Sequence, residues 1–199
     1  MQNDETGVIR TKLVRIDAQV DRAARIVDAM KAFEDNPRSD QSPIDCAAIV
    51  STAVDALASH YRRVGARIDI EPVPDEISIV CNPRFFQNIV ESLLVNALDA
   101  FEERSTENPI INIKQQLKDN NYVLEISDNG GGIDPEILEQ IFEPFATTKY
   151  SEHHPGLSLS VAWRKISGLG GKIQASNIDG GACFTVTLPK TGVSDQVVA

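Results

Sequence analysis

The chain contains the run Asp128-Asn129-Gly130-Gly131-Gly132-Ile133 at the point where a predicted strand ends. Three successive glycines permit backbone angles and close approaches that a side chain would block. An acid before such a loop can accept a hydrogen bond from the exocyclic amine of adenine, while the glycine backbone passes beneath the ring. The run therefore indicates ATP as a ligand, although a merely flexible loop would also be rich in glycine.

Pairs of short strands alternate with helices on both sides of this loop. Apolar and polar residues alternate, as in strands, at residues 66–71, 76–80, 110–117, 122–128, 172–176 and 183–188. Helical patterns cover residues 43–61, 83–103, 135–142 and 157–167. We expect Ser42 to cap the first helix and Asn82 the second, each followed by Pro at the first helical position. Because a regular strand-helix-strand rhythm is missing, the pattern predicts an α+β fold in which helices cover one face of a mixed sheet.

Apolar residues recur every three or four positions near the N-terminus. They are Leu13, Ile16, Val20, Ala23, Val27 and Met30. This heptad spacing predicts a long, coiled-coil-like helix that pairs with helices outside its own domain, the alternative being an amphipathic helix packed on that domain. A polar stretch around Pro37 follows. We expect this helix at residues 1–36, a linker at 37–43, one domain at 44–189 and a disordered tail at 190–199.

The composition excludes several classes of protein. The 199 residues include 19 Lys and Arg against 29 Asp and Glu, a net charge of −10, and no basic patch. A nucleic-acid partner and binding to anionic lipid are therefore disfavoured. No apolar run approaches the roughly 18 residues of a membrane helix, and the 3 cysteines form no CxxC pair. We expect a cytoplasmic domain with reduced thiols and no direct membrane contact.

A polar row lies beside the apolar face of the second long helix. It consists of Asn88, Ser92, Asn96 and Asp99. Asparagine weakens a helix and costs free energy when it is buried without a partner. An Asn96 whose amide oxygen binds Mg²⁺ would offset that cost, since Mg²⁺ takes one or two protein oxygens and fills its other positions with phosphate and water. The alternative is a simply solvated asparagine.

The segment after the short third helix can close over phosphate. Its aromatic anchors, Phe142-Glu143-Pro144-Phe145, precede Thr147-Thr148-Lys149, whose hydroxyl and ammonium groups suit phosphate oxygens. Gly156-Leu157 then opens the next helix, and amides at a helix N-terminus favour an anion. We expect this segment to form a lid over a triphosphate.

Together these motifs resemble the ATP-binding domain of sensor histidine kinases. They look like that family's N box (Asn96), first glycine box (Asp128-x-Gly130-x-Gly132), F box (residues 142–145) and second glycine box (Gly156-Leu157), in the family's order. The resemblance covers about residues 44–189 and implies a Bergerat-type (GHKL) two-layer α/β sandwich that binds ATP and Mg²⁺. It implies ATP contacts at Asn96, Asp99, Asp128, Gly130, Gly132, Ile133, Phe145, Thr147, Thr148, Lys149, Gly156, Leu157 and Thr185, with Asn96 as the metal ligand.

The N-terminal helix resembles the second helix of the kinase dimerisation hairpin. This implies a homodimer through that helix and a response regulator receiver domain as partner. In the family, a His on the first hairpin helix accepts the γ-phosphate, whereas His60, His153 and His154 all lie outside the heptad helix of this chain. We therefore assign no catalytic residue or acceptor here and expect no autophosphorylation by the chain alone. The acceptor helix and a sensor, in a parent protein with a possible membrane anchor, are expected outside it.

The histidines have simpler interpretations than catalysis. His60 is expected as a polar residue on a helix surface, and His153 with His154 as a solvated pair in the lid, the alternative for that pair being a metal site. The family's second glycine box usually has three glycines, but His154 and Ser158 stand at two of those places. This departure favours, as the alternative function, a non-catalytic ATP-binding adaptor that docks signalling partners.

Two further departures concern phosphate chemistry. Related gyrase and chaperone ATPases place a water-activating Glu four residues before Asn96, where this chain has Ser92. The missing base disfavours a third possibility, an autonomous ATPase. Asp99 stands where many kinases have a basic residue, which leaves Lys149 as the main phosphate contact.

Overall fold

A computed structural model describes residues 39–73, 77–146 and 156–190, together with Ile16, Val20, Ala24, Val27, Lys31 and Asn36. Its main sheet contains β2 (Arg67–Ile70), β4 (Ile110–Lys118), β5 (Asn121–Asp128), β6 (Lys172–Ile178) and β7 (Gly181–Pro189). The strand order is β2-β4-β5-β7-β6, with β2 and β4 parallel and all other neighbours antiparallel. The sheet is therefore mixed, as the sequence predicts.

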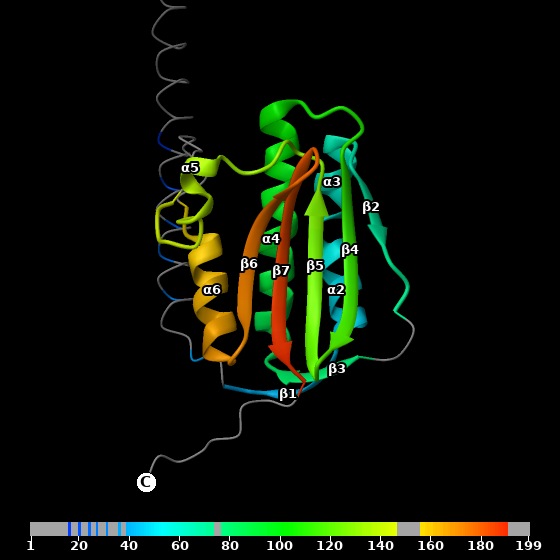
Figure 1. The fold of residues 1–199 in the computed structure, drawn as a ribbon, viewed down its shortest axis with the longest axis vertical. Coiled ribbons are helices and arrows are strands. Elements are labelled where there is room, and N and C mark those ends of the chain that lie inside the picture. Colours follow the sequence, from blue (N-terminus) through cyan, green and yellow to red (C-terminus); the bar gives the residue numbers. More distant parts are fainter. Residues whose placement is uncertain are drawn as a thin grey trace, which may run out of the picture.

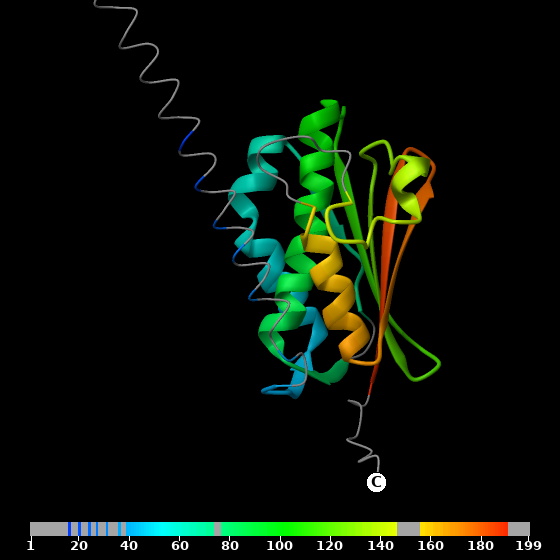
Figure 2. The same cartoon turned by 90° about the vertical axis from the view of Figure 1, so that its left-hand side faces the viewer.

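Helices cover one face of this sheet, so that the domain has two layers (Figures 1 and 2). The covering helices are α2 (Cys46–Ala56), α3 (Ala58–Val64), α4 (Pro83–Arg104) and α6 (Ser158–Gly168), while the short α5 (Pro135–Leu138) lies at the upper left in Figure 1. Buried side chains of α4, including Phe86 and Leu93, share one core with Tyr122 and Leu124 of β5. These two layers confirm the predicted α+β sandwich with helices on one face.

The central helix α4 begins where the sequence predicts. The Asn82 side chain accepts hydrogen bonds from the backbone N–H groups of Arg84 (3.0 Å) and Phe85 (3.2 Å), and Pro83 occupies the first turn, where no N–H partner is needed. The helix ends at Ser105, which adopts a left-handed conformation with φ 50°. These residues fix the two ends of α4.

The expected cap at Ser42 is wrong. Residues Ser42–Asp45 form a strand, β1, that pairs antiparallel with β3 (Ser78–Cys81) in a separate two-stranded sheet. The cap of α2 is Asp45, whose carboxylate accepts from the N–H groups of Ala47 (3.0 Å) and Ala48 (3.2 Å). Pro43 is compatible with this strand because it lies at a sheet edge. Ser42 and Pro43, assigned to the linker from the sequence, thus belong to a strand of the domain.

Two predicted helices differ in extent from the observed ones. The helix expected over residues 43–61 is divided into α2 and α3 at Leu57, whose N–H donates to the Val54 carbonyl (3.1 Å) in a tighter, three-residue turn. The helix expected over 135–142 ends at Leu138. Gly65 ends α3 with a left-handed φ of 74°, which glycine tolerates.

The described part of the N-terminal region is helical and exposes its apolar side chains. Ile16 and Val20 are 60% exposed and Val27 is 49% exposed. A helix that pairs with another helix presents exposed apolar side chains at heptad spacing, and these three residues fit that pattern. The rest of the predicted seam, and the tail from residue 191, lie outside the described residues. Among the residues that the structure describes, no helix is long and apolar enough to cross a membrane.

Candidate functional site

Asp128 ends β5 with a fixed carboxylate. It lies on the helix-covered face of the sheet and is 7% exposed. Its Oδ1 accepts hydrogen bonds from the backbone N–H groups of Gly130 (2.8 Å) and Ala182 (3.4 Å). Two amide donors from different elements hold this side chain in one orientation, which is the preorganisation that recognition of a base edge needs.

The loop after Asp128 favours glycine because of its backbone angles and because other parts of the chain approach it closely. Gly131 and Gly132 have φ values of 84° and 79°, which side chains rarely adopt. A Cβ on Gly130 would lie 3.1 Å from the Ala100 Cβ of α4. The Gly131 N–H donates to the Gly180 carbonyl (3.0 Å) in the turn between β6 and β7. The glycines therefore allow the loop to pack between α4 and this turn.

Three side chains that the sequence analysis did not identify hold the same loop. Arg104, at the end of α4, donates to the Gly130 carbonyl (2.6 Å). Asn177 of β6 accepts from the Ile133 N–H (2.7 Å) and donates to the Ile133 carbonyl (2.8 Å). Asn129 accepts from the Ile110 N–H (2.8 Å). Nothing local marks Arg104 or Asn177 in the sequence, whereas Asn129 could have been noticed inside the quoted run.

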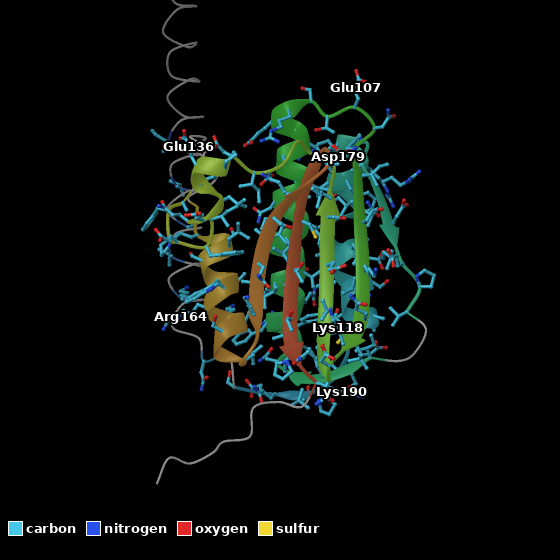
Figure 3. The ribbon with its side chains drawn as sticks, viewed as in Figure 1. Glu107, Lys118, Glu136, Arg164, Asp179 and Lys190 are labelled. Atoms are coloured by element: carbon cyan, nitrogen blue, oxygen red, sulfur yellow. The ribbon has the colours of Figure 1, made fainter. Side chains whose placement is uncertain are left out.

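This loop lies at the upper end of the sheet. Figure 3 labels Asp179, in the turn between β6 and β7, and Glu107, in the segment after α4, at that same end. Lys118 and Lys190 are labelled at the opposite end. The carboxyl end of β5, the end of α4 and the β6–β7 turn thus form one edge of the domain.

The surroundings of the Asn96 side chain are consistent with a metal ligand. Its side-chain nitrogen Nδ2 is buried and has no hydrogen-bond partner among the described residues. A buried amide without a partner costs free energy. Rotating the amide by half a turn places its oxygen at the same position, and an amide oxygen is a ligand that Mg²⁺ accepts. A bound ion or phosphate at Asn96 would therefore satisfy a group that the protein alone leaves unsatisfied.

Thr185 is not brought to this site. It pairs in register with Glu125 and Gln174, and its neighbours Phe184 and Val186 are the residues that face the core. Because side chains alternate between the two faces of a strand, Thr185 lies on the opposite face from Asp128. The β7 residue that does lie beside Asp128 is Ala182.

Asp99 is buried, 7% exposed, and lies with His60 of α3 and Glu102 of α4. Their possible ligand atoms are all within 4.8 Å of one another. The sequence analysis expected Asp99 to contact ATP and His60 to be a polar residue on a helix surface. The signal missed in the sequence was the i, i+3 spacing of Asp99 and Glu102, which places both carboxylates on one side of the helix.

The two ends of the predicted lid are in contact. The Phe145 N–H donates to the Gly156 carbonyl (2.9 Å), and both residues have left-handed φ values, 67° and 69°. A Cβ on Gly156 would lie 3.0 Å from the Phe145 carbonyl carbon. Leu157, 5% exposed, precedes α6. Thr147, Thr148, Lys149, His153 and His154 lie outside the described residues.

Comparisons with known proteins agree on one family. Residues 81–192 match the family described as histidine kinase-, DNA gyrase B-, and HSP90-like ATPase. The two-component sensor PprA of Pseudomonas aeruginosa is 34% identical over 182 residues, which are 89% of this chain and 20% of that protein. The signal transduction histidine-protein kinase AtoS of Escherichia coli is 29% identical over 184 residues, 90% of this chain and 29% of that protein.

Solved structures show the same fold. The catalytic domain of histidine kinase ThkA, in a nucleotide-free form, superposes with a TM-score of 0.67 and 24% identity over 76% of this chain and 99% of that chain. Full-length ShkA in complex with AMPPNP superposes with a TM-score of 0.74 and 19% identity, over 93% of this chain and 39% of that chain. The chain spans 20 to 31% of the length of the first curated relatives that it matches.

Proposed function

The chain belongs to the histidine kinase-, DNA gyrase B- and HSP90-like ATPases, and we propose that it is the catalytic domain of a two-component sensor histidine kinase that binds Mg-ATP for transfer of the γ-phosphate to a His outside this chain. The observation that carries the proposal is the Asp128 carboxylate. It is held by two backbone amides at the end of β5, beside a glycine loop fixed to three other parts of the chain.

In this proposal each group has one task. Asp128 accepts the adenine amine, and the Gly130–Gly132 backbone lies against the base. Asn96 holds Mg²⁺, which when bound offsets the negative charge of the phosphates. Phe145 and Gly156 tie the two ends of the lid, whose Thr147, Thr148 and Lys149 we propose as phosphate contacts.

The environment of Asn96 favours transfer over hydrolysis. Ser92, one turn earlier on α4, carries no carboxylate that could activate water. The nearest acid in sequence, Glu91, points about 100° around the helix from Ser92 and accepts a hydrogen bond from Gln87 (2.8 Å). The lack of a carboxylate at position 92 reduces the activation of water beside Asn96, which favours transfer to an acceptor.

The adenine assignment can be tested by Asp128→Asn, with ATP and inosine triphosphate compared by calorimetry in the presence of Mg²⁺. The Asn oxygen can still accept from Gly130 and Ala182, while its NH₂ group opposes the adenine amine. We expect ATP to bind about 10- to 100-fold more weakly, because a charged hydrogen bond is lost and two donors face each other. Inosine triphosphate, which offers a carbonyl in place of the amine, should lose much less.

A matched control is Asp134→Asn. Asp134 lies in the same loop and caps α5, and Asn caps a helix equally well, so both affinities should be unchanged. Equal losses for the two nucleotides in Asp128→Asn would mean that Asp128 supports the loop without reading the base. Unchanged affinity for ATP would refute the assignment.

We further propose homodimerisation through the N-terminal helix and phosphorelay to a receiver domain. The exposed Ile16, Val20 and Val27 support the first step, since they form a heptad seam. Radiolabelled ATP and an added dimerisation hairpin that carries the acceptor His test the transfer itself. If the chain binds Mg-ATP but never labels that hairpin, the non-catalytic adaptor is the better assignment.

A further inference from the structure

A second group of possible metal ligands joins α3 to α4, one helical turn beyond Asn96. It consists of His60, Asp99 and Glu102, and each offers one ligand atom within 4.8 Å of the others. Both views show α3 beside the upper half of α4 (Figures 1 and 2). The group therefore bridges two helices that are separate in sequence.

The nitrogen of His60 is the informative atom. Nε2 is buried and has no hydrogen-bond partner among the described residues, although it lies 3.5 Å from the Glu102 Oε1. A buried imidazole nitrogen that faces carboxylates without a hydrogen bond is unfavourable as it stands. A cation placed between the nitrogen and the two carboxylates would satisfy it.

Two of the three groups bring negative charge to this point. Asp99 and Glu102 are the two carboxylates, and Glu102 also pairs with Arg63, whose Nη2 lies 2.9 Å from Oε1. Asp99 is 7% exposed, so its charge is poorly screened by water. A guanidinium bonded to a ligating carboxylate is also a common outer partner that orients such a ligand.

The donor set selects the type of ion. One imidazole nitrogen and two carboxylate oxygens are typical ligands of Zn²⁺, which completes four-coordination with water. Mg²⁺ favours oxygen ligands throughout and retains most of its water. We propose that His60, Asp99 and Glu102 bind one Zn²⁺ ion that links α3 to α4, separately from the Mg²⁺ expected at Asn96.

The site can be tested by titrating the whole chain, without nucleotide and in excess Mg²⁺, with Zn²⁺ against a chromogenic chelator. Co²⁺ serves as a spectroscopic substitute. We expect one equivalent of either ion per chain, and visible Co²⁺ bands without the near-ultraviolet band of a thiolate ligand. His60→Ala should weaken binding by at least ~10-fold. Zn²⁺ should raise the midpoint of thermal unfolding of the original chain but not of His60→Ala.

Two control variants remove the other candidate zinc ligands. The double variant His153→Ala/His154→Ala and Cys183→Ser should both keep the equivalent of Zn²⁺. If His60→Ala does not fold, as judged by circular dichroism, Glu102→Gln replaces it, because Glu102 is 43% exposed in its side chain and the change preserves its shape. Retention of full affinity in the variant tested, or loss of the ion in either control, would overturn the proposal.

Discussion

Replacement of Gly181 by Ala should disrupt both the sheet and the nucleotide site. Gly181 begins β7, and a Cβ built on it would lie 2.6 Å from the Asp128 carbonyl carbon and 2.9 Å from the Asn129 Cα, and closer still to the Asp128 carbonyl oxygen. Carbon atoms in contact prefer about 3.5 to 4.0 Å. The start of β7 must therefore move away from β5 by about 1 Å, because backbone atoms on both sides cannot rotate aside as a side chain would.

The cost follows from two losses. Overpacking of this kind costs about 1 to 3 kcal/mol. The same movement stretches the bond from the Ala182 N–H to the Asp128 Oδ1, already 3.4 Å long, and a hydrogen bond to a charged group contributes about 1.5 kcal/mol or more. We expect the free energy of unfolding to fall by about 2.5 to 4.5 kcal/mol, with a parallel loss of ATP affinity.

The neighbouring glycine provides the control. A Cβ on Gly180 would meet nothing within 4 Å, but its φ of 75° is strained for alanine. Gly180→Ala should therefore cost only about 1 to 2 kcal/mol. Urea unfolding followed by circular dichroism measures the free energy of unfolding of both variants. An unchanged m-value would show that their unfolded states are comparable. Equal destabilisation of the two variants would refute the argument from close approach.

Two further predictions concern the loop and the buried thiols. Asn177→Ala removes both hydrogen bonds to Ile133 and should weaken ATP binding, measured by calorimetry, about 10-fold. The control Gln174→Ala, on an exposed part of the same strand, should leave the affinity for ATP unchanged. An equal loss of affinity in both variants would contradict the role given to Asn177. Burial raises the pKa of both Cys46 and Cys81 from 9.0 to about 12, so between these values the unfolded chain ionises thiols that the folded chain keeps protonated. The free energy of unfolding should then be insensitive to these thiols below about pH 8 and fall by about 1.4 kcal/mol per thiol per pH unit above pH 9. Urea unfolding at pH 8 and pH 10 should show a steeper decline for the original chain than for Cys46→Ala/Cys81→Ala, and equal declines would exclude the thiols as the cause.

Local signals were enough to predict most of the fold. Asn82 and Pro83 start α4, Gly65 ends α3, and Asp119 with Asn120, both at positive φ, form the turn between β4 and β5. Each of these signals acts over a few residues, through backbone conformation or a nearby amide. The periodicity of apolar residues then distinguished helix from strand and indicated which face is buried.

The nucleotide motif was also recognisable from the sequence, because its acid and glycines are adjacent in the chain. The groups that hold this motif in place were not recognisable from the sequence, because they come from positions far away in the chain. The Asn177 side chain binds Ile133 across 44 residues, and the Ala182 amide binds Asp128 across 54. Such contacts depend on which strands pair and in what register, and a single strand does not specify either.

Register also explains the two clearest differences between prediction and structure. It turns Thr185 away from Asp128, and it pairs Ser42–Asp45 with β3 where a helix cap was expected. The sequence alone determined most of the elements and the motif that we propose to bind adenine, since both depend on neighbours in the chain. Only the tertiary structure decided that His60 meets Asp99 and Glu102, because packing of α3 on α4 brings together side chains about 40 positions apart.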